Sequence, residues 1–92
     1  SISNFSAERG DKVATVNSKN IYKKLPSYIL LEKEGAKKGS ARYNELMTKA
    51  TKNYKRVLRA VAVKKKFVLI VEQGGVVDYK SEKATTLCIG EI

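Results

Sequence analysis

Residues 40–62 read SARYNELMTKATKNYKRVLRAVA and carry two signals with the same period. Apolar side chains recur at the i, i+3, i+4, i+7 spacing that is typical of one face of an α-helix, at Tyr43, Leu46, Met47, Ala50, Tyr54, Val57, Leu58 and Val61. Cations fall on the opposite side of the same helical wheel, at Arg42, Lys49, Lys52, Lys55, Arg56 and Arg59. The stretch therefore predicts a long amphipathic helix that buries one face and presents positive charge on the other.

The N-terminal part of the chain predicts a tail followed by a strand. Residues 1–11 are mostly polar or small, so we expect a flexible tail there and a single α+β domain over residues 12–92. Residues 12–17, KVATVN, contain a short β-branched run between turn-forming residues. This pattern predicts an edge strand.

Between that strand and the long helix, the sequence indicates one or two short helical pieces. Ser18 can cap the first piece, and Pro26 interrupts it because proline lacks a backbone N–H and restricts the residue before it. Pro26 can then begin a second helix that ends at Gly35 and packs through Ile29, Leu30 and Lys33. The alternative is that residues 28–31 form a strand.

The C-terminal part predicts a β-meander. Residues 67–71, FVLIV, are apolar on both faces, which is typical of a central strand. Gln73-Gly74-Gly75 predicts a turn into an antiparallel strand at residues 76–79, and residues 81–83 predict a second turn into a strand at 84–89. The expected fold class is α+β, with the long helix and the short helical pieces packed on one face of a three- to four-stranded antiparallel sheet.

The charge of the chain is concentrated in one segment. The 92 residues include 19 basic and 9 acidic side chains, for a net charge of +10. Residues 37–66 contain a single acid, Glu45, and eleven cations, so this segment has a directional field that attracts polyanions. We therefore predict a nucleic-acid-binding site formed by Lys37, Lys38, Arg42, Lys49, Lys52, Lys55, Arg56, Arg59, Lys64, Lys65 and Lys66.

The partner is expected to be DNA or RNA, bound through its backbone. A lipid surface is disfavoured because the core needs the apolar face of the helix. Lysines outnumber arginines 15 to 4, and lysine contacts phosphate as a point charge whereas the fork of arginine reads guanine edges. Tyr43 and Tyr54 are assigned to the core, which leaves Tyr22, Tyr28 and Tyr79 as candidate stacking platforms. Residues 35–40, GAKKGS, predict a turn with helix caps at both ends, and a phosphate contact within a wider footprint is the functional alternative.

The sequence also limits the chemistry. Cys88 is the only cysteine and there is no histidine, so no internal disulfide and no Cys/His zinc site can form, and we expect neither a metal nor another cofactor. Cys88 lies in an apolar run and is predicted to be a buried thiol. The chain has no apolar run of membrane-spanning length, and its N-terminus lacks the pattern of a signal peptide, which favours a cytoplasmic or nuclear protein without a membrane partner.

Two other functions stay open at this point. In element order and charge the chain resembles the RelE-type bacterial ribonuclease toxins, which implies RNA cleavage by Lys, Arg, Tyr or Glu in place of His. No motif of that family falls on these residues, and Gly74-Gly75 and Glu91 stand where the resemblance requires a basic catalytic end strand. The other alternative is an interaction module that docks an acidic protein surface, through edge pairing of a strand at residues 84–89.

Overall fold

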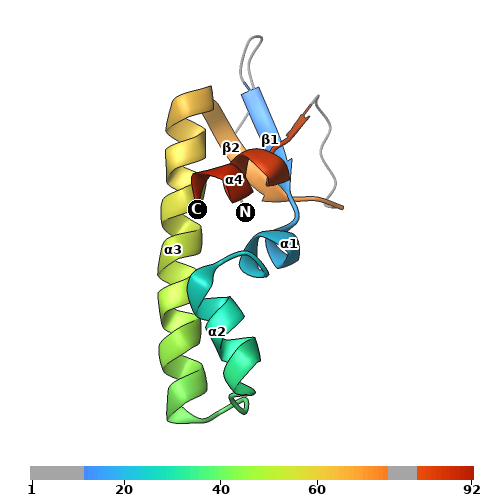
Figure 1. Ribbon diagram of the computed structural model, residues 1–92. Coiled ribbons are helices and arrows are strands. Elements are labelled where there is room, and N and C mark those ends of the chain that lie inside the picture. Colours follow the sequence, from blue (N-terminus) through green and yellow to red (C-terminus); the bar gives the residue numbers. More distant parts are fainter. Residues whose placement is uncertain (1–11, 75–80) are drawn as a thin grey trace.

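The computed structural model describes residues 12–74 and 81–92. A long helix, α3, lies along one side of the molecule, with the sheet and α4 beside its C-terminal part and α2 beside its N-terminal part (Figure 1). The elements are β1 (Lys12–Val16), α1 (Ser18–Tyr22), α2 (Pro26–Glu34), α3 (Ala41–Lys65), β2 (Phe67–Glu72), β3 (Glu82–Lys83) and α4 (Thr85–Glu91). The fold class is α+β, as predicted. The long helix lies over a sheet that has three strands in the part of the chain that the structure describes.

The sheet is parallel, so the antiparallel prediction is wrong. Its order is β2-β1-β3, and β1 pairs in parallel with both neighbours, for example Ala14 with Ile70 and Ala14 with Glu82. The reason lies in the connection between β1 and β2, which contains three helices and returns the chain to the starting end of the sheet. The predicted edge strand β1 is therefore central, and the predicted central strand β2 lies at an edge of the described sheet.

Helix α3 buries the apolar face that its sequence predicts. Leu46, Ala50, Val57 and Val61 are buried, and the other apolar residues of the stripe are half-buried. The C-terminal part of this face joins the core cluster, which consists of Ala14, Val16, Ile21, Val57, Val61, Phe67, Ala84 and Cys88. The core thus lies between α3, the sheet and α4, and the predicted buried position of Cys88 is confirmed.

The start of α3 is confirmed, and its end is later than predicted. The Ser40 Oγ accepts a hydrogen bond from the Tyr43 backbone N–H at 3.1 Å, as expected of an N-cap. The helix continues through Lys65 and ends where Lys66 adopts a left-handed φ of 59°. The helix thus runs beyond residue 62, where the amphipathic stretch ends, and Val63 lies on its solvent side, where it is 78% exposed.

Helix α2 begins at Pro26 and ends at Gly35, which has a φ of 65°, so the helix prediction is confirmed and the strand alternative is wrong. Its buried stripe differs from the prediction: Leu31 is buried, whereas Ile29 and Leu30 are 47% and 38% exposed. Successive residues are about 100° apart around a helix axis, so Leu31 faces away from Ile29 and Leu30, and α2 packs through a different side from the predicted one. For α1 the cap is Asn17 and not Ser18, because the Asn17 Oδ1 accepts a hydrogen bond from the Asn20 N–H at 3.1 Å.

The predicted strand at residues 84–89 is wrong, because Thr85–Glu91 form helix α4. Ala84 and Cys88 are fully buried and four residues apart, a spacing that places both on one side of a helix. Their packing in the core outweighs the local β propensity of residues 84–89. The predicted tail at residues 1–11 and the predicted strand at 76–79 lie outside the described residues. Among the helices of the described chain, none combines the length and the apolar character needed to cross a membrane.

Candidate nucleic-acid interface

Five cations of α3 form an exposed group, which we call the α3 cation face: Lys49, Lys52, Lys55, Arg56 and Arg59. None of the five makes an ion pair with an acid among residues 12–74 and 81–92. Arg56 donates hydrogen bonds only to neutral groups, the Asn53 Oδ1 at 3.0 Å and the Glu91 carbonyl oxygen at 3.4 Å. The positive charge of this face is therefore available to an external anion, and its first and last members are about 15 Å apart along the helix axis.

Arg42, which the sequence predicted as part of the same site, differs from these five residues because it pairs with acids. Its guanidinium donates two hydrogen bonds to the Glu34 carboxylate, at 2.8 and 2.7 Å, and a third to Glu45 on the same helix. The hydrogen bond from Arg42 lowers the pKa of Glu34, and the two carboxylates raise the pKa of Arg42. A bidentate pair of this kind fixes geometry, so Arg42 connects α3 to the end of α2 and has little charge left for a ligand.

The other predicted cations lie at the two ends of α3. Lys37 and Lys38 are exposed in the loop before the helix, and Lys65 and Lys66 are exposed at its C-terminus. These ends are separated by the length of α3, about 37 Å. Lys64 at the C-terminal end forms an ion pair with Glu91 of α4 at 2.7 Å. The eleven predicted residues thus extend over the whole length of α3 and the loop before it, and the α3 cation face is the central part of that length.

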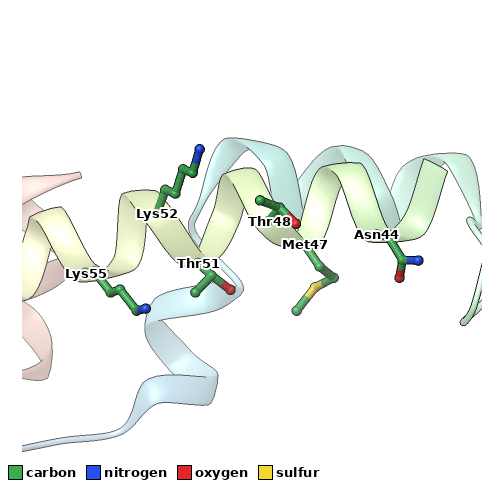
Figure 2. A pocket seen from close by; sticks show the side chains of 6 residues that line it. All are labelled: Asn44, Met47, Thr48, Thr51, Lys52 and Lys55. Atoms are coloured by element: carbon green, nitrogen blue, oxygen red, sulfur yellow. The ribbon is translucent and has the colours of Figure 1, made fainter. Parts of the chain in front are cut away.

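An open depression of about 380 Å³ lies beside the α3 cation face. It is lined by Asn44, Met47, Thr48, Thr51, Lys52 and Lys55. Figure 2 shows Met47, Thr51 and Lys55 pointing to one side of α3, with Lys52 on the opposite side. The neutral polar members of this lining were missed by the sequence reasoning, although Asn44, Thr48 and Thr51 recur at helical spacing between the apolar stripe and the cations.

Three tyrosines form a row at the end of α1. The ring of Tyr22 stacks on Tyr54, with centroids 4.8 Å apart, and makes an edge contact with Tyr28 at 6.0 Å. The Tyr22 hydroxyl is hydrogen-bonded to the Thr51 hydroxyl at 3.1 Å. Tyr54 packs against the core, as predicted, whereas Tyr22 and Tyr28 line a second depression of about 220 Å³. Tyr79 lies outside the described residues.

The loop at residues 35–40 has the backbone geometry of the predicted turn. Gly35 and Gly39 both have positive φ, 65° and 90°, which favours glycine. Gly35 ends α2 and Ser40 caps α3, so both glycines serve the connection between two antiparallel helices. A phosphate contact by Lys37 and Lys38 stays a prediction.

Three groups that could support catalysis make structural contacts or are buried. The Glu72 carboxylate accepts hydrogen bonds from the Ser18 backbone N–H at 3.0 and 3.2 Å. Burial, together with the nearby charge of Glu72, raises the pKa of Tyr54, and burial likewise raises the pKa of the Cys88 thiol. The antiparallel strands on which the RelE-type resemblance depended do not occur in the described residues, and no set of three or more potential metal ligands occurs there.

Comparison with known proteins does not add a relative to this picture. No model of a protein family matches the chain. No curated protein and no solved structure matches it significantly.

Proposed function

We propose that the protein binds nucleic acid through the phosphate backbone, using the α3 cation face. The observation that supports this most directly is the contrast within one helix. Arg42 is neutralised by two carboxylates, whereas the five residues of the α3 cation face are exposed and have no described acidic partner. Such an arrangement leaves like charges close together on α3, and a polyanion would relieve their repulsion.

The chemistry of the face favours backbone contacts over base-specific contacts. Three of its five residues are lysines, and Arg56 already uses its guanidinium to contact Asn53. The opposite face of α3 is buried in the protein, so the helix has no apolar side with which to enter a lipid surface. A phosphate backbone, which repeats negative charge along its length, matches this stretch of about 15 Å.

A matched pair of charge-reversal variants tests the proposal. The first variant changes four members of the face: Lys49→Glu, Lys52→Glu, Arg56→Glu and Arg59→Glu. The second changes four exposed lysines away from α3: Lys12→Glu, Lys23→Glu, Lys24→Glu and Lys83→Glu. Both variants lower the net charge from +10 to about +2, so a general effect of charge acts on both alike.

Binding is measured by fluorescence anisotropy with labelled DNA and RNA oligonucleotides. We expect the first variant to lose at least about 100-fold in affinity and the second to lose far less, because only the first removes phosphate contacts. Circular dichroism and thermal melting should show that both variants stay folded. Equal losses in the two variants would contradict an interface on α3.

The same samples test the alternatives. Labelled RNA is incubated with the wild-type protein and analysed on a denaturing gel, where intact RNA agrees with binding and fragments would indicate an enzyme. An affinity that does not change with salt, or binding to an acidic protein in place of nucleic acid, would favour the interaction module.

A further inference from the structure

The two depressions beside α3 adjoin at Met47, which lines both. We call the two together the aromatic trough: residues of α3 line the first depression, and residues of α1, α2 and α3 line the second. Its residues that matter here are Lys19, Tyr22, Tyr28, Met47, Thr51 and Lys55. Along α3 the trough runs from Asn44 to Lys55, about 16 Å, which is room for a few nucleotides.

The aromatic part of the trough is held in place before any ligand arrives. Tyr22 has one ring face against Tyr54 and its hydroxyl bonded to Thr51. Tyr28 ends the row of three rings and lines the trough with Tyr22 and Met47. A fixed aromatic surface loses little conformational entropy on binding, and the thioether of Met47 adds a polarisable contact for a ring.

Two cations line the same trough as these rings. Lys19 lines the trough beside Tyr22, and Lys55 belongs both to the trough and to the α3 cation face. Aromatic platforms next to lysines are the combination by which proteins hold single strands, because each unpaired base offers a ring face and each nucleotide a phosphate. A duplex hides its base faces in the stack, so it could use the lysines but not the rings.

We infer that the aromatic trough binds unpaired bases, so that the nucleic acid held by this protein is single-stranded. The inference rests on the proposed function, and adds to it the strandedness of the ligand and the residues that recognise it. Tyr28 provides the outermost stacking surface, and Tyr22 packs against its ring. Lys55 contacts the strand at the point where it continues onto the α3 cation face.

The experiment compares a ten-nucleotide oligothymidine with a ten-base-pair duplex. Tyr28→Ala removes the ring and Tyr28→Phe keeps it, so the second variant is the matched control. We expect Tyr28→Ala to lose about 5- to 150-fold in affinity for the single strand, the range of one stacked base, and Tyr28→Phe to keep most of it. Neither variant should change duplex binding, and the wild-type protein should bind the single strand more tightly.

The chain has no tryptophan, so its intrinsic fluorescence comes from its five tyrosines, and two of them line the trough. We expect the single strand, but not the duplex, to quench this fluorescence. A photo-crosslink from 5-iodouridine in a single strand to wild-type protein should map to Tyr22, Tyr28 or Met47. This measurement needs no variant, so it decides the question even if Tyr28→Ala does not fold.

Several results would overturn the inference: unchanged single-strand affinity in folded Tyr28→Ala, a wild-type preference for the duplex, or crosslinks that avoid the trough. Displacement of the oligonucleotide by polyglutamate at equal affinity would also overturn it, in favour of an acidic peptide. In the first three cases the α3 charge-reversal variant can still abolish binding, so the proposed function would stand. If that variant binds normally, the proposed function fails as well.

Discussion

The salt dependence of binding should follow the number of residues in the α3 cation face that contact phosphate. The face has five residues, and Arg42, which pairs with Glu34 and Glu45, is not among them. Each phosphate neutralised on a single strand contributes about −0.7 to the slope of log affinity against log salt, so five contacts predict a slope of about −3.5. Raising the salt from about 50 to 200 mM should then weaken binding roughly 100-fold.

Single substitutions measure how much each residue contributes to the slope. Lys52→Gln should make the slope shallower by about 0.7, because it removes one phosphate contact. Arg42→Gln removes the same charge from the same helix but should leave the slope almost unchanged, since Glu34 and Glu45 already neutralise that guanidinium. Lys23→Gln, at an exposed site outside α3, serves as the control for net charge.

The assay is fluorescence anisotropy with oligothymidine at five or more salt concentrations, with each variant's folding checked by circular dichroism. A wild-type slope shallower than about −1 would mean that fewer than two cations contact phosphate, and would refute the proposed face. Equal effects of Arg42→Gln and Lys52→Gln would show that the ion pairs of Arg42 do not withhold it from a ligand.

Three further predictions concern the fold itself. Leu46→Ala, at a position only 2% exposed, should lower the free energy of unfolding by about 2 to 5 kcal/mol in a urea titration, and an effect below about 1 kcal/mol would mean that α2 does not pack tightly on α3. Glu34→Gln should lower the melting temperature at pH 7. Because pairing with Arg42 lowers the folded-state pKa of Glu34, this stabilisation is complete above the ordinary value of 4.5 and is lost as the pH falls through the folded-state pKa, so wild type and variant should converge in acid. The Cys88 thiol, buried and with a raised pKa, should react with Ellman's reagent at pH 8 only as fast as the protein opens, and a rate equal to that in denaturant would contradict its burial.

Helix α3, its start and the two ends of α2 could be predicted because their signals are local. Ser40, Pro26 and Gly35 are each required by the backbone at a helix end, so their positions are informative without knowledge of the fold. The direction of the strands carries no such local signal. The run at residues 67–71 has the same apolar pattern in a parallel or an antiparallel sheet, and at its centre or its edge, so the topology depends on long-range contacts.

Part of the candidate site could likewise be predicted from the sequence, and part of it could not. The helical wheel places the five cations of the α3 cation face on one side of α3, and the structure has all five exposed there. The ion pair between Arg42 and Glu34 could not be predicted from the sequence, because the two residues meet only after the loop at residues 35–40 folds α2 back on α3. The contact between Tyr22 and Tyr54 likewise joins α1 to α3 across the core.

The length of α3 is more than the sheet requires. Strand β2 has six residues and spans about 20 Å, which a helix of about 13 residues would match, whereas α3 has 25 residues. The additional turns bury Leu46 and Ala50, which lie outside the core cluster that the sheet shares, and α2 packs alongside them. A crossover between parallel strands does not need this extension, whose exposed side carries several cations and one acid, Glu45. The aromatic trough and the first members of the α3 cation face lie on this additional length, so the proposed binding role gives a reason for it that the topology does not.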